Sequence, residues 1–210
     1  ADNGITGKFV RGSISGNIIR NAGAKAISLS QNSVNTNVTG NEITNCGTVG
    51  IAIVGATSND CKNITVSGNN ITKSEGAAAG KEDITITFTN DSTVAHNSST
   101  SFQTKLLISG TCTSLSVIGN HFDMVDADPG SNLDCIKSDG TLTHCVVNSN
   151  TLRSSVFKSR QAGLNLNVAE KCVVNGNAFD NFDTGIKIVA SGDNNQLTNN
   201  VFTNVDNEVS

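Results

Sequence analysis

An eight-residue segment, Val38-Thr39-Gly40-Asn41-Glu42-Ile43-Thr44-Asn45, returns in altered form along the whole sequence. One asparagine marks each copy, at intervals of 23 to 30 residues. We call these residues the anchors: Asn17, Asn41, Asn69, Asn97, Asn120, Asn150, Asn177 and Asn200. The residue three positions before each anchor is aliphatic, and the residue two positions after it is apolar in every copy except the one with Ser99. A repeat of this length is typical of a solenoid or another repeat architecture.

Each repeat also contains a second apolar alternation, about ten residues after the anchor in most copies. Examples are Gly50-Ile51-Ala52-Ile53, Gly163-Leu164-Asn165-Leu166 and Gly185-Ile186-Lys187-Ile188. A period of two in β-branched residues indicates strands. One such unit cannot bury its apolar side alone, whereas stacked units bury a continuous core. The sequence therefore predicts an all-β fold, a parallel β-helix of about eight coils formed by residues 1–210 as one domain.

The anchors have a structural role in this fold. Asparagine tolerates the left-handed backbone conformation, and its amide both donates and accepts hydrogen bonds. We expect the anchors to stack in one column, where each amide bonds to the next and to the backbone of a buried turn. The anchors are then scaffold residues.

Composition excludes several classes of partner. The formal net charge is −4 and no basic cluster occurs, which argues against nucleic acid as a partner. No apolar run approaches 18 residues, so we expect no membrane insertion. The sequence begins and ends inside a repeat, and we expect it to be a segment of a longer chain or to have its ends covered by partner chains.

The six cysteines fall on core positions of the repeat. Cys145 and Cys172 share one position relative to their anchors, and Cys61 and Cys112 share another. Side chains stacked in this way run parallel, which strains a disulfide. We expect buried, reduced thiols and assembly in a reducing compartment.

Three repeats have longer turns between the anchor and the second strand. The extra residues run from Lys73 to Asp83, from Asp123 to Asp134 and from Arg153 to Gly163. Insertions at one repeat position map to one face of a solenoid, and such loops commonly hold the functional site. Stacking one coil on the next would place carboxylates beside guanidinium groups. The short fourth turn would leave a groove between the third and fifth.

The repeat pattern resembles that of a known protein family. The pattern Gly40-Asn41-Glu42-Ile43-Thr44-Asn45 followed by Gly50-Ile51-Ala52-Ile53 resembles the right-handed parallel β-helix of the pectin-lyase-like superfamily. The polar strands and cysteine usage look most like bacteriophage tailspikes, which form trimers and bind or cleave bacterial surface glycans. This resemblance implies a homotrimer in a virion tail, assembled in the host cytoplasm, with bacterial surface polysaccharide as the partner. A secreted polysaccharide lyase or epimerase is an alternative. The sequence contains no epimerase or pectate-lyase motif that would transfer a catalytic residue.

Two classes of function remain open. In a glycan depolymerase, hydrolysis needs one protonated and one ionised carboxyl group, about 6.5–9.5 Å apart for inversion. The catalytic candidates are Asp126 or Asp128 together with Glu75 or Asp134. A lyase would need a base and a cation that neutralises a uronate. Residues expected to contact the substrate are His121, Asp123, Arg153, Lys158 and Arg160. The alternative is a non-catalytic adhesin or structural shaft, which the absence of Trp and Tyr favours.

No cofactor is expected. A Ca²⁺ site in the segment from Asp123 to Asp134 is a further hypothesis, because its oxygen ligands suit hard cations, although the spacing matches no known calcium loop.

Overall fold

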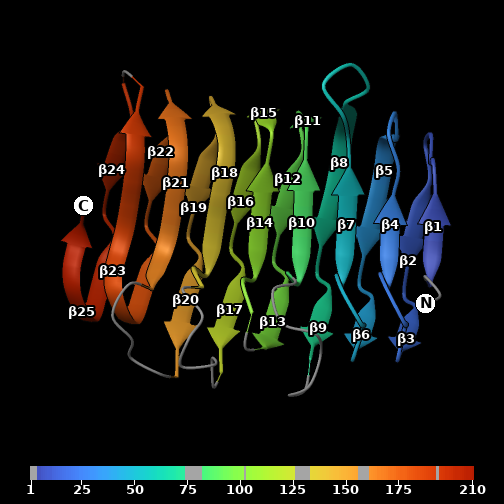
Figure 1. Cartoon of the computed structure of the whole chain (residues 1–210), viewed down its shortest axis with the longest axis horizontal. Helices are drawn as coiled ribbons and strands as arrows, with labels where there is room; N and C mark the ends of the chain where they lie inside the picture. Colours follow the sequence, from blue (N-terminus) through green and yellow to red (C-terminus); the bar gives the residue numbers. More distant parts are fainter. Residues whose placement is uncertain (1–3, 74–81, 102, 126–132, 156–160, 193) are drawn as a thin grey trace.

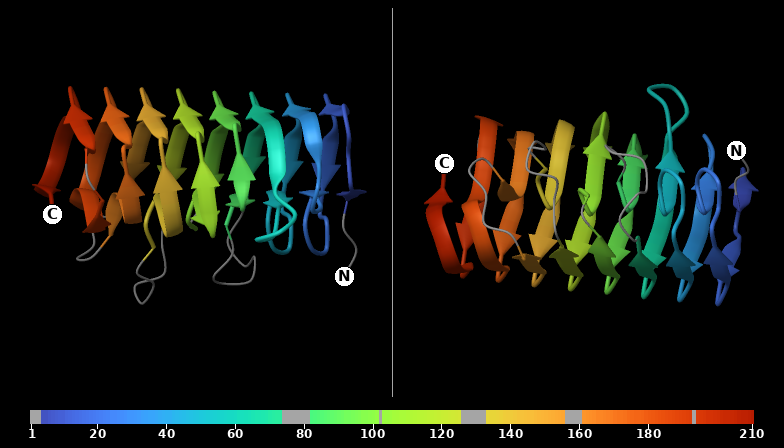
Figure 2. Two further views of the ribbon diagram at one scale, coloured as in Figure 1. Left: turned by 90° about the horizontal axis from the view of Figure 1, so that it is seen from above. Right: turned by 60° about the horizontal axis from the view of Figure 1, so that its bottom comes forward.

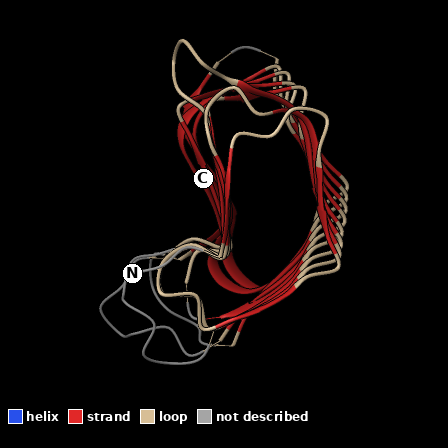
Figure 3. Ribbon diagram, turned by 90° about the vertical axis from the view of Figure 1, so that its right-hand side faces the viewer, coloured by secondary structure: helices blue, strands red, loops and turns tan. Residues whose placement is uncertain are grey.

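The computed structural model describes residues 4–73, 82–101, 103–125, 133–155, 161–192 and 194–210. These residues form 25 β-strands, and all the strand pairings among them are parallel. The strands stack coil on coil into an elongated solenoid (Figure 1). Viewed along the solenoid axis, the coils superpose into one closed outline (Figure 3). The predicted fold class, an all-β parallel solenoid, is confirmed.

The first column of strands lies immediately before the anchors. It contains β2 (Ser13–Ser15), β5 (Val34–Thr39), β8 (Cys61–Ser67), β12 (Thr93–Ala95), β16 (Ser116–Ile118), β19 (Val146–Asn148), β22 (Val173–Asn175) and β24 (Gln196–Thr198). The register places Val38 between Ile14 and Val66, and the later copies continue the same row. The aliphatic residue of each repeat therefore stacks on its equivalent in the next coil.

The second column follows the anchors. It contains β3 (Ile18–Arg20), β6 (Glu42–Thr44), β9 (Asn70–Thr72), β13 (Ser98–Ser101), β17 (His121–Met124), β20 (Thr151–Ser154) and the first parts of β23 (Ala178–Ser191) and β25 (Val201–Val209). The third column corresponds to the second apolar alternation. It contains β1 (Ile5–Gly7), β4 (Ile27–Leu29), β7 (Ile51–Val54), β10 (Ile84–Thr87), β14 (Leu106–Ser109), β18 (Ile136–Thr143), β21 (Ala162–Glu170) and the later parts of β23 and β25.

Two short strands continue from the third column around the next corner. These are β11 (Thr89–Asn90) and β15 (Thr111–Thr113), which pair with the start of β8 and the end of β18. The two views in Figure 2 show that equivalent strands lie side by side along the whole solenoid. Each face of the solenoid is therefore built from equivalent strands of successive coils.

The core is the interior of the solenoid. In β10, Ile84 and Ile86 are buried whereas Thr85 and Thr87 are partly exposed, and the same alternation continues through the columns. The core cluster contains rows of isoleucine, valine and leucine together with Phe122, Phe179 and Phe182. Burial of these rows supplies the main stabilisation, because removing apolar surface from water is worth about 25 cal/mol per Å².

The anchors form a continuous hydrogen-bonded ladder. Each side-chain Nδ2 donates to the Oδ1 of the next anchor at 2.9–3.0 Å, from Asn17 through to Asn200. The same Oδ1 also accepts the backbone N–H of the preceding anchor. The predicted single column of anchors is confirmed.

The left-handed conformation expected at the anchors lies one residue earlier. The left-handed residue in each turn is the one before the anchor, with φ between 54° and 66°. Glycine occupies this position in five coils, and His96, Ser149 and Asn199 occupy it in the others. Glycine reaches this conformation without a Cβ penalty. The asparagine is thus needed for its amide, and the glycine for the bend.

A buried ionic cluster interrupts the apolar core in the third and fourth coils. The Lys73 and Lys105 ammonium groups lie 3.2 and 3.4 Å from the two carboxylate oxygens of Asp83, and all three side chains are fully buried. Ser99 and Ser101 donate hydrogen bonds to Asp83 Oδ2, and Lys73 donates to the carbonyl oxygens of Thr48 and Glu82. Burial lowers the pKa of Lys105.

Lys73 and Asp83 were expected in a long surface turn, and this expectation is wrong. Both are core residues at the two ends of that turn. The sequence does contain a sign of this buried cluster. Ser99, two residues after its anchor, is polar at a position that is apolar in the other repeats. A single polar substitution inside a core row indicates a buried partner, because an unpaired buried hydroxyl is costly.

The six cysteines are buried, as predicted, and they are free thiols in the structure. Cys145 and Cys172 lie directly before the paired residues Val146 and Val173, so they occupy the same position in successive coils. Burial raises the pKa of the Cys61 and Cys112 thiols, which disfavours the reactive thiolate.

Candidate functional site

The three long turns begin and end at one corner of the solenoid. Thr72, Asp123 and Arg153 belong to one row of the second column, in which Thr100 lies between Thr72 and Asp123. On the return side, the backbone N–H of Cys135 donates to the carbonyl oxygen of Ala162. The shared corner is therefore confirmed for the residues that flank the turns. The predicted groove between the third and fifth turns lies outside the described residues.

Three of the four predicted catalytic residues lie outside the part of the chain that the structure describes. Glu75, Asp126 and Asp128, together with the predicted contact residues Lys158 and Arg160, lie outside the described residues. The calcium hypothesis also involves this segment. Among the residues that the structure does describe, no group of three or more His, Cys, Asp or Glu side chains is arranged to hold a metal ion.

His121, Asp123 and Arg153 are strand residues of the second column. Asp123 and Arg153 are register partners in adjacent coils, but the ion pair of Arg153 is with Asp180, whose Oδ2 lies 3.5 Å from Arg153 Nε. Arg153 and Asp180 are substantially exposed, and such an ion pair contributes little to stability. The predicted long turns begin too early at Asp123 and Arg153, because both residues still belong to strands.

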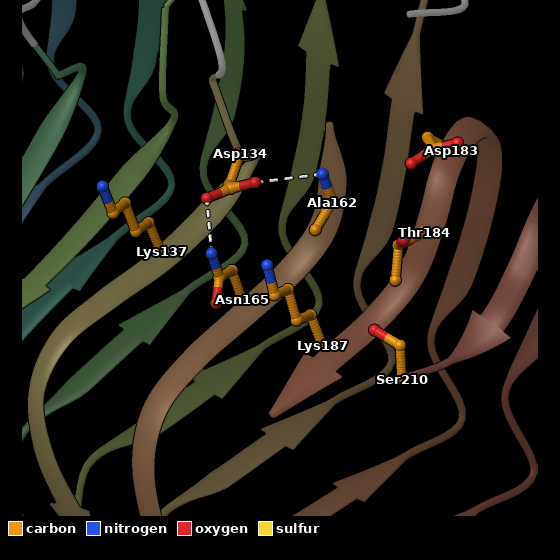
Figure 4. Close-up of a pocket in the computed structure, with 8 residues that line it drawn as sticks. All are labelled: Asp134, Lys137, Ala162, Asn165, Asp183, Thr184, Lys187 and Ser210. Atoms are coloured by element: carbon orange, nitrogen blue, oxygen red, sulfur yellow. Dashed lines mark hydrogen bonds between the residues drawn. The ribbon is translucent and has the colours of Figure 1, made fainter. Parts of the chain in front are cut away.

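Asp134 lies two residues before β18 of the third column. It lines an open pocket of about 460 Å³ across β18, β21 and β23. The lining residues are Asp134, Lys137, Ala162, Asn165, Asp183, Thr184, Lys187 and Ser210 (Figure 4). His121, Asp123 and Arg153 do not line this pocket.

Asp134 is 6% exposed and fixed by two hydrogen bonds. Its Oδ1 accepts the backbone N–H of Ala162 at 3.0 Å, and its Oδ2 accepts Asn165 Nδ2 at 2.7 Å. Burial raises the pKa of Asp134, whereas these two hydrogen bonds and the positive charges of Lys137 and Lys187 partly oppose that rise. A carboxyl group with a raised pKa is a candidate proton donor.

Lys137, Asn165 and Lys187 form a row on the outside of the solenoid. They are register partners on β18, β21 and β23, and each points away from the buried isoleucine and leucine residues beside it. Figure 4 shows their side chains next to Asp134. We call these three residues the Lys-Asn-Lys row.

Asn165 has an unpaired acceptor in this pocket. Its Nδ2 faces the Asp134 carboxylate, and its Oδ1 is buried with no hydrogen-bond partner among the described residues. A buried polar atom without a partner costs about 1–3 kcal/mol. Because this oxygen is itself buried, the charged groups of the row that a ligand can reach are the two lysines.

Asp134→Asn should increase the free energy of unfolding at neutral pH. A carboxyl group whose pKa is raised by folding stabilises the protein below its ordinary pKa of 3.8 and loses that contribution as the pH rises through the folded-state pKa. We expect the gain in the free energy of unfolding to follow the rise in the folded-state pKa. The introduced amide can also donate to Asn165 Oδ1 after the Asn165 amide turns over.

Urea denaturation of both proteins between acidic and neutral pH checks this prediction. The difference between them should vanish at the acidic end. A variant that is less stable than the wild type by the same amount at every pH would show that Asp134 acts only through its hydrogen bonds.

The repeat was recognised from its apolar residues, which face the core, and these residues do not reveal the Lys-Asn-Lys row on the outside. Asn165 and Lys187 are the middle residues of two strand segments that are marked by their apolar neighbours. Since side chains alternate across a strand, the residue between two buried ones faces outward. Aligning those outward positions from repeat to repeat would have placed Asn165 beside Lys187.

No helix in the described part of the chain is long and apolar enough to span a membrane. No protein-family model matches the sequence, and no curated protein matches it.

Among solved structures, the chain is similar to the surface protein and adhesin PfbA of Streptococcus pneumoniae. The sequences are 14% identical, the TM-score is 0.63, and the match covers 94% of this chain and 68% of that chain. A second similar structure is ORF18 of Geobacillus virus E2, with 12% identity and a TM-score of 0.43 over 93% of this chain and 53% of that chain. The likeness to PfbA supports the β-helix fold, and at this identity it shows the fold alone.

Proposed function

We propose that this chain is a β-helix segment of a tailspike-like or adhesin-like protein that binds an acidic polysaccharide on the Lys-Asn-Lys row. One observation supports the proposal above all: Lys137 and Lys187 flank Asn165 in one row of register partners that lines an open pocket. An acidic sugar chain would lie over Asn165. The lysines would neutralise acidic groups on either side of it.

The spacing of the row suits an extended chain. Neighbouring strands are about 4.8 Å apart, so Lys137 and Lys187 are attached about 10 Å apart along the solenoid axis. Two cations at this separation would contact different sugar units of one chain. A polysaccharide lying along the solenoid would therefore gain from both contacts without bending.

Replacing both lysines tests the binding proposal. Lys137→Ala with Lys187→Ala should weaken binding to an acidic polysaccharide by about tenfold or more, since each lost charge contact costs roughly a kcal/mol. Binding should be measured with alginate, polygalacturonate and hyaluronate, at low and high salt, with neutral dextran for comparison. The wild-type affinity should fall with salt.

Lys62→Ala is the matched control, because Lys62 is exposed on β8 in the first column. This variant removes one lysine charge from another face, against two in the double variant, and should bind like the wild type. Equal loss in the control and the double variant would mean that binding follows net charge alone. No preference for the acidic polymers over dextran would contradict the proposal.

Depolymerisation is the second candidate function, and the raised pKa of Asp134 favours it. A protonated Asp134 would donate to the leaving glycosidic oxygen, and Asp183 lines the same pocket as a second carboxyl group. Asp134→Asn should then abolish the release of new reducing ends while leaving binding within about threefold. Release of unsaturated uronate ends would instead indicate a lyase.

Several expectations from the sequence stay predictions. These are the homotrimer, the attachment to a virion tail with assembly in the host cytoplasm, the secreted alternative and the non-catalytic shaft. The choice of a bacterial surface glycan as the natural polysaccharide also belongs with them.

A further inference from the structure

A second pocket, of about 340 Å³, lies at the corner between the third column and strands β11 and β15. Its lining differs completely from that of the Asp134 pocket. It contains one aromatic ring, one carboxylate, one amide and three hydroxyl groups, from Phe88, Asp60, Asn90, Thr57, Thr111 and Thr113. Its volume lies within the range of about 300–1,000 Å³ that is usual for ligand pockets.

Phe88 has an unusual backbone conformation. Its φ is 47°, in the left-handed region that bulky residues rarely adopt. The register pairs Thr87 with Val54 and with Ser109, so the residues equivalent to Phe88 in the adjacent coils are Gly55 and Gly110. Phe88 thus occupies a glycine position. Strain of this kind is concentrated at functional sites.

Glycines in the two adjacent coils make room for the phenyl ring and its backbone. A Cβ on Gly110 would lie 2.6 Å from Phe88 Cζ, and a Cβ on Gly55 would lie 2.2 Å from the Phe88 carbonyl oxygen. A Cβ on Gly140 would lie 1.9 Å from the Gly110 carbonyl oxygen. The ring therefore rests against Gly110, and it remains half-buried at the pocket rather than entering the core.

The polar groups of this pocket are held in place around the ring. Asn90 Nδ2 donates to Asp60 Oδ2 at 2.9 Å, which fixes both side chains. The other carboxylate oxygen of Asp60 makes no hydrogen bond among the described residues and remains an acceptor for a ligand hydroxyl. Thr57, Thr111 and Thr113 can each donate and accept. Since Asp60 is the one charged residue of the lining, an anionic ligand would be disfavoured.

We infer that this pocket binds a neutral hexopyranose, with one sugar face on the Phe88 ring and the hydroxyls on Asp60, Asn90 and the threonines. The C–H face of a pyranose packs on an aromatic ring, and its hydroxyls need polar partners. This inference goes beyond the proposed function, because it involves another pocket and a ligand of different charge. It does not depend on the Lys-Asn-Lys row.

Two-dimensional NMR of the ¹⁵N-labelled protein tests the inference with glucose, galactose, mannose, rhamnose and N-acetylglucosamine, and with glucuronate as the anionic comparison. At least one neutral sugar should shift the amide resonances of Phe88, Asn90 and Thr113 in a saturable way, with a millimolar Kd. Glucuronate should not. If no neutral sugar shifts these resonances at about 50 mM, the inference is overturned.

Phe88→Gly is the informative variant, because glycine is the residue that the adjacent coils have at this position. It should fold with an unchanged or higher Tm and bind the sugar at least about tenfold more weakly. Asp60→Asn, which keeps the shape of the side chain, should also weaken binding. A fall in Tm of about 10 °C or more in Phe88→Gly would show that the ring is needed for folding, and would overturn the inference.

Lys137→Ala separates this inference from the proposed function. The variant should keep neutral-sugar binding at Phe88 even though it removes part of the Lys-Asn-Lys row. If Lys137→Ala lost binding to both the acidic polysaccharide and the neutral sugar, the two pockets would not be independent binding sites. Unchanged neutral-sugar binding in Phe88→Gly would contradict the assignment to this pocket.

Discussion

Asn97→Ala should lower the free energy of unfolding by about 4 kcal/mol. The substitution removes four hydrogen bonds at about 1 kcal/mol each, and the cost is higher where a buried group is left unpaired. Asn97 Oδ1 accepts from the backbone N–H and the Nδ2 of Asn69. Asn97 Nδ2 donates to the carbonyl oxygen of Val66 and to Asn120 Oδ1.

Urea denaturation followed by circular dichroism measures this effect. Asn59→Ala is a matched control, because the Asn32–Asn59 amide contact is on the surface and 3.2 Å long. The control should change the free energy of unfolding by less than about 1 kcal/mol. If the two variants were equally stable, the anchor ladder would not be a main source of stability.

Asp83→Asn should be destabilising by about 3–5 kcal/mol. The side chain keeps its shape, but the ammonium groups of Lys73 and Lys105 lose the carboxylate that neutralises them inside the core. Removing one partner from a buried ion pair leaves an uncompensated charge, which is far more costly than the pair itself was favourable.

The effect of Asp83→Asn should depend on pH in a defined direction. Burial lowers the pKa of Lys105 below its ordinary value of 10.5. A buried lysine with a lowered pKa destabilises the fold while it is charged, and the penalty shrinks as the pH rises toward 10.5. The difference between the variant and the wild type should therefore narrow in alkaline solution.

Glu42→Gln is the control for the Asp83 prediction. Glu42 Oε1 lies 3.6 Å from Arg20 Nη2, and both side chains are about half exposed or more. Loss of this surface pair should cost less than about 1 kcal/mol. An Asp83→Asn variant as stable as Glu42→Gln would show that the buried cluster is not ionic.

The fold could be predicted from the sequence because every coil repeats the same physical requirement. A residue such as Val66 must be aliphatic since it stacks between Val38 and Val94, and Asn69 must carry an amide since it bonds to Asn41 and Asn97. These constraints recur in each repeat. The position of the left-handed residue was misassigned by one place, because glycine and asparagine adjoin in most copies.

The site could be predicted only in part, since it depends on residues that occur once. Asp134 was recognised as a candidate by its charge, but its neighbours Lys137 and Lys187 come from β18 and β23, which the repeat pattern describes only by their inward residues. Phe88 was missed for a similar reason. It replaces a glycine at one turn, and a single exception in a degenerate repeat has no meaning until the register is known.

The most direct test of the proposed function is a crystal structure of the protein with an acidic oligosaccharide. We expect a sugar along β18, β21 and β23, with an acidic group within hydrogen-bond distance of the Lys137 or Lys187 ammonium. An oligosaccharide bound on another face, with this pocket empty, would contradict it.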